Sequence, residues 1–140
     1  MGQDLSEREL QRSGPAPQFG LAKSYPGFSP MGPTLVTLDE LADPDDLALG
    51  CEVNGVTVQS SRTSNMIFSV PTLVSYLSQI VTLYPGDVIY TGTPSGVGMG
   101  RTPPTFLAEG DVLRSWVEGL GELRQTMVRP PAPERPADPG

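Results

Sequence analysis

The sequence predicts an α+β fold that is rich in β-strands and has one main amphipathic helix. Three observations support this prediction. Sixteen glycines and sixteen prolines among 140 residues indicate many turns. The pair Asn54-Gly55 lies between two runs of alternating apolar and polar residues, which predicts a β-hairpin. Apolar residues at helical spacing predict a helix over 71–83.

The first element expected along the chain is a short helix near the N-terminus. Ser6 and Glu9 match a capping box, in which Ser6 begins the helix and Glu9 reaches back to it. Arg8 and Gln11 are three residues apart on one helical face, and Asp4 lies just before the cap. These polar residues either converge on one side of the helix or lie on an ordinary solvated face.

A loop rich in glycine and proline follows over 13–33, and a short strand is expected over 34–38. The strands of the central hairpin flank Asn54-Gly55, because a type I′ turn needs positive φ at both central residues. A further short strand is expected over 88–91. A last hairpin is expected over 112–117 and 123–128.

The apolar stripe of the helix over 71–83 is expected to be core, and Met66–Phe68 is expected to be buried. One partial domain over 1–128 is expected. The remaining stretch, 129–140, has five prolines and only alanine as an apolar residue, which predicts a disordered tail. A polyproline docking peptide is the alternative for that tail.

The composition excludes several classes of protein. The chain has 16 acidic and 9 basic residues and a net charge of −7, which argues against nucleic acid and anionic membrane as partners. It has no apolar run of a membrane span and no signal peptide, so a cytoplasmic location is expected. Cys51 is the single cysteine and histidine is absent, which excludes a Ser-His-Asp triad and imidazole metal ligands within one chain.

Two segments have residue types suited to binding anions. The loop over 91–100 contains glycines and two threonines, and it is either an anion-binding loop or a conformationally demanding turn. Lys23 is the only lysine, and it is either a selected point charge or a solvated surface residue. The sequence leaves both alternatives open.

Five motifs in the same order resemble the fumarylacetoacetate hydrolase family. Gln3–Gln11 is similar to the family motif Asn-Asp-x-Ser-Ala-Arg-Asp-x-Gln, and Ala22–Pro33 is similar to its Gly-Lys-Ser-Phe and Pro-x-Gly-Pro segments. Val53–Phe68 resembles the family hairpin and the segment after it, and Tyr84–Gly98 resembles its signature phrase. Phe106–Gly121 resembles the last motif, so the resemblance covers about residues 3–128.

The resemblance implies a β-roll or sandwich, a homodimer, and a divalent cation, usually Mg²⁺ and otherwise Mn²⁺ or Ca²⁺. It implies small keto acids as substrates, with hydrolysis of C–C bonds in acylpyruvates or fumarylacetoacetate, or isomerisation or decarboxylation of related dioates. It further implies that Asp4 is a metal ligand and Lys23 is the lysine of the catalytic site. Arg8, Gln11 and Thr93 correspond to residues that bind substrate.

The chain departs from the family pattern at its N-terminus. In the family, a Glu-x-Glu pair supplies two metal carboxylates and a Glu-His pair supplies the base, and both lie upstream of the motif of Asp4. Only three residues precede Asp4 here, so the chain is expected to be incomplete at its N-terminus and to bind Mg²⁺ weakly by itself. The hypotheses are an impaired family enzyme, a non-catalytic remnant that serves as a dimer scaffold or binds organic anions, and an unstable fragment.

Overall fold

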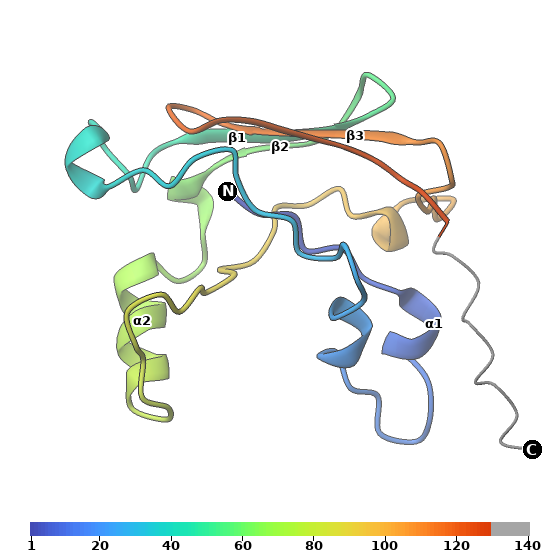
Figure 1. The fold of residues 1–140 in the computed structure, drawn as a ribbon, viewed down its shortest axis with the longest axis horizontal. Coiled ribbons are helices and arrows are strands. Elements are labelled where there is room, and N and C mark those ends of the chain that lie inside the picture. The colour runs from blue at the N-terminus through green and yellow to red at the C-terminus, as the bar shows by residue number, and fades with distance from the viewer. Residues whose placement is uncertain (130–140) are drawn as a thin grey trace, which may run out of the picture.

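The computed structural model describes residues 1–129, which form one antiparallel sheet of four strands in the order β2-β1-β3-β4. The sheet forms one layer, and both helices and the connecting segments lie against or below the same face (Figure 1). The α+β, β-rich fold class is therefore confirmed. The elements are α1 (Arg8–Gln11), η1 (Leu21–Lys23), η2 (Leu38–Glu40), β1 (Ala48–Val53), β2 (Val56–Arg62), η3 (Thr63–Asn65), α2 (Val70–Ser78), η4 (Gly98–Gly100), β3 (Val112–Val117) and β4 (Gly121–Thr126).

The central hairpin is confirmed at the predicted turn. Asn54 and Gly55 have φ values of 52° and 81°, which is the left-handed conformation that a type I′ turn requires. Farther along the hairpin the register shifts, because Cys51 pairs with Gln59 while Glu52 pairs with Thr57. One residue of β2, Val58, is therefore extra, and this β-bulge changes the face on which the following side chains lie.

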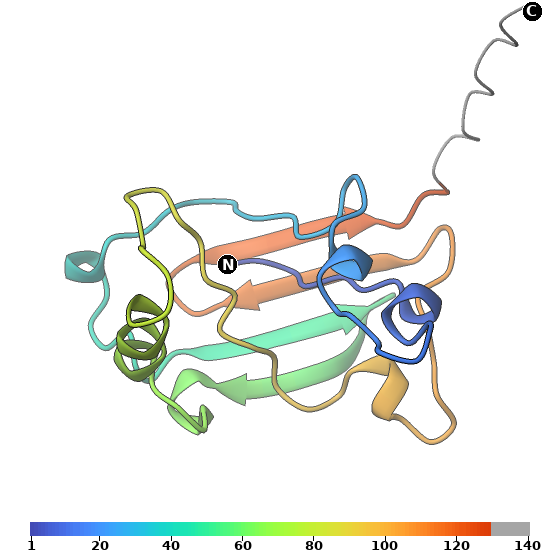
Figure 2. The same cartoon turned by 90° about the horizontal axis from the view of Figure 1, so that it is seen from below.

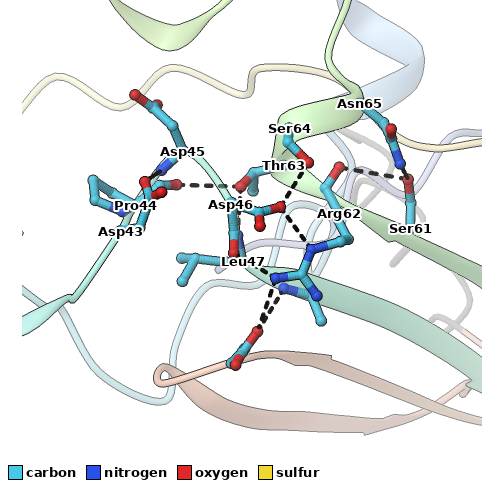
Figure 3. A network of polar contacts seen from close by, with 12 residues as sticks. Asp43, Pro44, Asp45, Asp46, Leu47, Ser61, Arg62, Thr63, Ser64 and Asn65 are labelled. Atoms are coloured by element: carbon cyan, nitrogen blue, oxygen red, sulfur yellow. Dashed lines mark hydrogen bonds and ion pairs between the residues drawn. The ribbon is translucent and has the colours of Figure 1, made fainter.

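A polar network closes the far end of the same hairpin (Figure 3). The Arg62 guanidinium donates to a carboxylate oxygen of Asp46 at 2.6 Å, and the Ser64 hydroxyl donates to the same oxygen at 2.6 Å. These donors, Arg62 first, hold the pKa of Asp46 below its usual value. The network fixes the loop that enters β1 to the end of β2.

The open face of the sheet carries a row of charges across three strands. Arg114 on β3 bonds to Glu52 on β1 at 3.1 Å and to Glu122 on β4 at 2.7 Å. Cross-strand partners of alternating residues share a face, so this row lies opposite the side on which Cys51 and Ser115 point. The charged face is thus separated from the face that the connecting segments cover.

The predicted capping box at Ser6 is wrong. Glu7 caps α1, because its carboxylate accepts hydrogen bonds from the backbone N–H groups of Glu9 at 3.1 Å and Leu10 at 2.6 Å. A carboxylate also interacts favourably with the positive end of a helix. The Ser6 hydroxyl lies one residue too early for this role and instead donates to the Asp4 carbonyl oxygen at 3.5 Å.

The two short strands expected over 34–38 and 88–91 do not form. Neither segment has a ladder partner among residues 1–129, and Leu38 begins a 3-10 turn. The segment that follows α2 crosses the strands obliquely on the covered face of the sheet (Figure 2). A β-strand requires a neighbouring strand whose N–H and C=O groups are aligned with its own. Residue types that favour a strand are therefore not sufficient to form one here.

The helix expected over 71–83 is present but shorter, as α2. It begins at Val70 with Ser69 as its cap, and it ends at Ser78. None of its residues is buried, and Ile67 and Phe68 are 92% and 60% exposed, so the predicted burial of the stripe and of Met66–Phe68 is wrong. The reason is that α2 lies beyond the sheet and no second layer within residues 1–129 covers it (Figure 1).

The buried apolar core of the described residues is small and consists of Ala22, Cys51 and Leu113. No helix among residues 1–129 has both the length and the apolar character that crossing a membrane requires. The disordered tail was predicted over 129–140, and all of it except Arg129 lies outside the described residues.

Candidate functional site

The N-terminal segment is fixed to the centre of the sheet through Gln3. Its side-chain amide donates to the Ser115 hydroxyl of β3 and to the Cys51 sulfur of β1, the latter at 3.5 Å. The Gln3 backbone N–H also donates to the Pro30 carbonyl oxygen at 3.0 Å. Asp4 is the next residue, so these contacts determine where its carboxylate lies.

Asp4 and Lys23, both expected at the site, form an ion pair. Their side chains are about one third exposed, at 33% and 30%. The backbone N–H of Glu7 donates to the Ala22 carbonyl oxygen at 2.9 Å, which joins the start of α1 to η1 and holds the two residues in place. The ammonium of Lys23 is therefore a cation of fixed position that solvent or a ligand can still reach.

Arg8 and Gln11 are also brought together, on the single turn of α1. The Arg8 guanidinium donates to the Gln11 side-chain oxygen at 2.6 Å, so of the two alternatives that the spacing left open, these two residues do converge. Gln11 is 4% exposed, whereas Arg8 is partly exposed. Gln11 thus holds Arg8, and the other donors of the guanidinium remain available to a carboxylate.

Thr93 lies on the glycine-rich loop over 91–100, and within residues 1–129 it forms no hydrogen bond with the other four predicted site residues. Its hydroxyl accepts a hydrogen bond from the Gln59 side chain at 2.8 Å. Tyr90, three residues earlier, connects this loop to the N-terminal region, because its O–H donates to the Ser29 carbonyl oxygen at 2.8 Å. Ser29 in turn donates to the Lys23 carbonyl oxygen at 3.4 Å.

Tyr90 also lies close to the start of the chain. A Cβ atom at Gly2 would lie 2.7 Å from atoms of the Tyr90 ring, so the two residues are in close contact. Burial raises the pKa of Tyr90, and the negative charge of Asp4 adds to the rise. Tyr90 and Gln59 lie within two of the motifs that carry the family resemblance, but neither was predicted as a site residue; the β-bulge that turns Gln59 toward the covered face is seen only in the structure.

Cys51 is an inert group in this arrangement. It is 5% exposed, and burial raises the pKa of its thiol despite the hydrogen bonds from Ser115 and Gln3. A thiol that is protonated at neutral pH is a poor nucleophile. Its contribution is therefore to packing beneath Gln3.

The described residues do not form a complete metal site. Asp4 is the predicted ligand, and one of its oxygens is bonded to the Lys23 ammonium. No group of three or more Asp, Glu, Cys or His side chains that could hold a metal occurs within residues 1–129. Mg²⁺ requires several oxygen ligands in near-octahedral geometry, and a single paired carboxylate does not provide them.

The family of the chain follows from a comparison of its sequence with family models. The model of the fumarylacetoacetate (FAA) hydrolase C-terminal domain matches residues 1–128. The chain belongs to this family. The resemblance inferred from the five motifs is therefore confirmed, while the individual roles of Asp4, Arg8, Gln11, Lys23 and Thr93 remain predictions.

Solved and curated members of the fumarylacetoacetate hydrolase family are similar to most of this chain. A crystal structure of a protein described as HpcE from Mycobacterium smegmatis is 68% identical, with a TM-score of 0.89, over 91% of this chain and 47% of that one. The rat protein named oxaloacetate tautomerase Fahd2a, mitochondrial, is 48% identical over 126 residues, which are 89% of this chain and 40% of the rat protein.

A more distant family member was crystallised with ligands. Maleylpyruvate hydrolase from Sphingobium sp. SYK-6, in complex with manganese(II) ion and pyruvate, is 34% identical with a TM-score of 0.69, over 77% of this chain and 38% of that one. The chain thus spans between about two fifths and one half of the length of these relatives. Members with this fold include proteins named as hydrolases, isomerases and tautomerases.

Proposed function

We propose that this chain carries the keto-acid-binding residues of a family enzyme whose reaction passes through an enolate. The ion pair of Asp4 and Lys23 supports the proposal most directly, because it holds a partly exposed ammonium in a fixed position. A fixed cation stabilises an oxyanion as it forms, without the cost of reorganising solvent. The Arg8 guanidinium, held by Gln11, offers further donors that suit the carboxylate of a keto acid.

The chemistry assigned to these residues is binding and charge stabilisation. The carboxylate of the substrate would pair with Arg8, and the keto oxygen would lie near Lys23. When a proton leaves the adjacent carbon, or when a C–C bond breaks, negative charge moves onto that oxygen. Lys23 then stabilises the enolate more strongly than the uncharged ketone, which lowers the barrier.

Tautomerisation of oxaloacetate is the first reaction to test. It requires proton transfer and no attack by water, so it demands less of the site than hydrolysis does. The rat relative is named for this reaction. Hydrolysis of acylpyruvates and isomerisation of dienedioates share the enolate and are the next reactions in order.

A second candidate is a module that binds organic anions without turnover. This candidate is favoured because residues 1–129 contain no cluster of metal ligands: Asp4 is a single carboxylate, and it is already paired with Lys23. In this case Arg8 and Lys23 would bind the keto acid but no reaction would follow. The two candidates are distinguished by measuring binding and turnover in the same protein.

The experiment uses the 140-residue chain and a chimera in which residues 1–128 replace the matched part of the Mycobacterium smegmatis relative. We expect the chimera to accelerate the decay of the enol absorbance of oxaloacetate. Lys23→Met should lower its kcat by about 10²-fold. Arg124→Met removes the same charge from an exposed position on β4 and should leave kcat unchanged.

Two results would contradict the enzymatic proposal. Equal kcat values for the chimera and its Lys23→Met variant would remove the assigned role of Lys23. If the chimera binds pyruvate or oxaloacetate but no enolate reaction is accelerated, the anion-binding module is the better description. The 140-residue chain alone is expected to bind such acids weakly and to turn over none of them.

A further inference from the structure

The glycine-rich loop, residues 91–100, is in close contact with β2, the strand at one edge of the sheet (Figure 2). A side chain at Gly96 would collide with the carbonyl oxygen of Val58, so the loop backbone and β2 are in close contact. The Arg101 guanidinium donates twice to the Gly96 carbonyl oxygen, at 3.0 and 2.9 Å. These contacts fix the loop independently of any ligand.

The β-bulge at Val58 determines where Gln59 points. Because Val58 is the extra residue, Gln59 lies directly opposite Cys51. Cross-strand partners point to the same face, and Cys51 points toward Gln3 on the covered face. Without the bulge, Gln59 would point to the opposite face, away from the loop.

The orientation of the Gln59 amide is determined by its partners. Its nitrogen lies 2.8 Å from the Pro94 carbonyl oxygen and 2.8 Å from the Thr93 hydroxyl oxygen. A carbonyl oxygen only accepts, so the NH₂ group and not the amide oxygen must face Pro94. The second amide proton is then donated to Thr93, whose hydroxyl acts as the acceptor.

This arrangement leaves the proton of the Thr93 hydroxyl free. A hydroxyl has one donor and two acceptor sites, and Gln59 occupies one acceptor site. The structure gives Thr93 no further hydrogen-bond partner among residues 1–129, and its side chain is exposed. The hydroxyl is therefore presented to the outside of the loop as a donor.

We propose that Gln59 is a positioning residue that keeps Thr93 oriented as a hydrogen-bond donor to an anionic oxygen of the ligand. The proposal rests on the function proposed above, since the ligand class is a small keto acid. Gln59 does not touch the ligand. Its effect passes through Thr93, so removing it should matter only while the Thr93 hydroxyl is present.

The bond itself is tested in the 140-residue chain by NMR, without a ligand. Both side-chain amide protons of Gln59 should exchange slowly with water. Thr93→Val should accelerate the exchange of one of them and leave the other, which is bonded to Pro94, slow. The side-chain amide of Gln79, which donates to the Ser75 carbonyl oxygen at 3.2 Å on α2, is the internal control. Fast exchange of both Gln59 protons in the wild type would overturn the proposal.

The effect on binding is tested by titrating pyruvate into four proteins: wild type, Gln59→Met, Thr93→Val and the double variant. Loss of an oriented hydrogen bond predicts binding roughly tenfold weaker for Gln59→Met, and no further loss when it is added to Thr93→Val. Gln79→Met should bind as the wild type does. An equal loss in both backgrounds, or no loss at all, would overturn the positioning role.

These outcomes separate the proposal from the proposed function. If the wild type and Gln59→Met bind pyruvate equally, the keto-acid site stands and the role of Gln59 fails. If the wild type binds no pyruvate, the function proposed for this chain fails, and the exchange rates of the Gln59 protons alone decide whether Gln59 holds the hydroxyl.

Discussion

Asp4 has one strong partner, Lys23, and this limits what Asp4 can do as a metal ligand. We predict that the 140-residue chain binds Mg²⁺ or Mn²⁺ weakly, because no cluster of ligands surrounds Asp4 within residues 1–129. Asp4→Asn should leave the binding isotherm unchanged in a calorimetric titration. Asp46→Asn, which removes an exposed carboxylate paired with Arg62, is the matched control.

The contrary result is easy to recognise. Micromolar affinity that disappears in Asp4→Asn and persists in Asp46→Asn would mean that further ligands reach Asp4, from a second copy of the chain or from a rearrangement of the N-terminal segment. The metal site would then be more complete than the geometry of residues 1–129 indicates.

Substituting alanine at Gly96 and at Gly86 distinguishes two costs: the steric clash of the glycine-rich loop with β2, and the strain of a positive φ. Both have positive φ, 109° and 98°, but only at Gly96 would a side chain collide with another part of the chain. We predict that Gly86→Ala lowers the free energy of unfolding by about 1 kcal/mol. Gly96→Ala should lower it by about 3 kcal/mol, since overpacking is added to the strain.

Urea unfolding of both variants measures this difference. If the two variants lose the same free energy, the loop does not press against Val58 in solution. The contact that fixes Thr93 in the structure would then be absent, and the inference about Gln59 would weaken with it.

At the scale of elements, local sequence signals predicted structure well where the pairing partner lies nearby in the sequence. The central hairpin formed as predicted, because the turn residues Asn54 and Gly55 determine the geometry and the two strands are neighbours in sequence. The strands expected over 34–38 and 88–91 were wrong, because pairing depends on a distant partner that local sequence does not reveal. The bulge at Val58, and with it the direction of Gln59, was not predicted, because alternation of residue types does not show where one strand contains an extra residue.

For the candidate site, too, the sequence selected residues that come together but not the long-range contacts that position them. The ion pair of Asp4 and Lys23 and the bond between Arg8 and Gln11 join residues that the motifs had selected. The contacts that position them, from Gln3 to Ser115 and from Tyr90 to Ser29, connect segments far apart in the sequence. No spacing rule within a single motif could have indicated these contacts.

The turn of the central hairpin is also connected to β3, and this leads to a prediction for Asn54. Its side chain accepts from the Val112 backbone N–H and donates to the Asp111 carboxylate, each at 2.8 Å. Asn54→Ala should lower the free energy of unfolding by about 2 kcal/mol, from the lost acceptor for Val112 and the unfavourable φ of alanine. Asn65→Ala, which removes one exposed bond of 3.3 Å to Ser61, should cost less than about 0.5 kcal/mol.

The pH dependence of the Asn54 variant provides a second check. Hydrogen bonds from Ala108 and then from Asn54 hold the pKa of Asp111 below its usual value. A carboxyl group with a lowered pKa in the folded state stabilises the protein above its ordinary pKa, and this contribution is lost as the pH falls through the folded-state pKa. The difference between wild type and Asn54→Ala should therefore narrow in acid, and a difference that is constant with pH would contradict the bond to Asp111.

At the scale of the whole molecule, the dominant feature is the apolar surface that residues 1–129 leave uncovered. Leu35 is 98% exposed, and Val74 on α2 and Ile80 just after it are 39% and 63% exposed. Such surface promotes association, so we predict that the 140-residue chain self-associates with increasing concentration and binds a hydrophobic dye. Sedimentation velocity over a concentration series measures the association and also tests the homodimer expected from the family.

A pair of variants distinguishes association through α2 from nonspecific association of exposed apolar residues. The double variant Val74→Ser and Ile80→Ser should reduce association, because it alters the apolar side of α2. Val128→Ser, at a residue 78% exposed near the other end of the described chain, is the control and should change association little. A protein that remains monomeric and binds no dye would contradict the prediction, since its apolar side chains would then be covered by its own chain in solution.

The bond between Gln3 and Ser115 has a consequence for the order of events during synthesis. These two residues are 112 positions apart, so Gln3 leaves the ribosome long before its partner on β3 has been made. Until β3 has been made, Gln3 has only the Cys51 sulfur of β1 as a sheet partner, and a product that terminated before Ser115 would lack the second contact that fixes Gln3, and with it Asp4, to the sheet. The assembly of the site should therefore be slow in comparison with that of the central hairpin, whose partners are made within a few residues of each other.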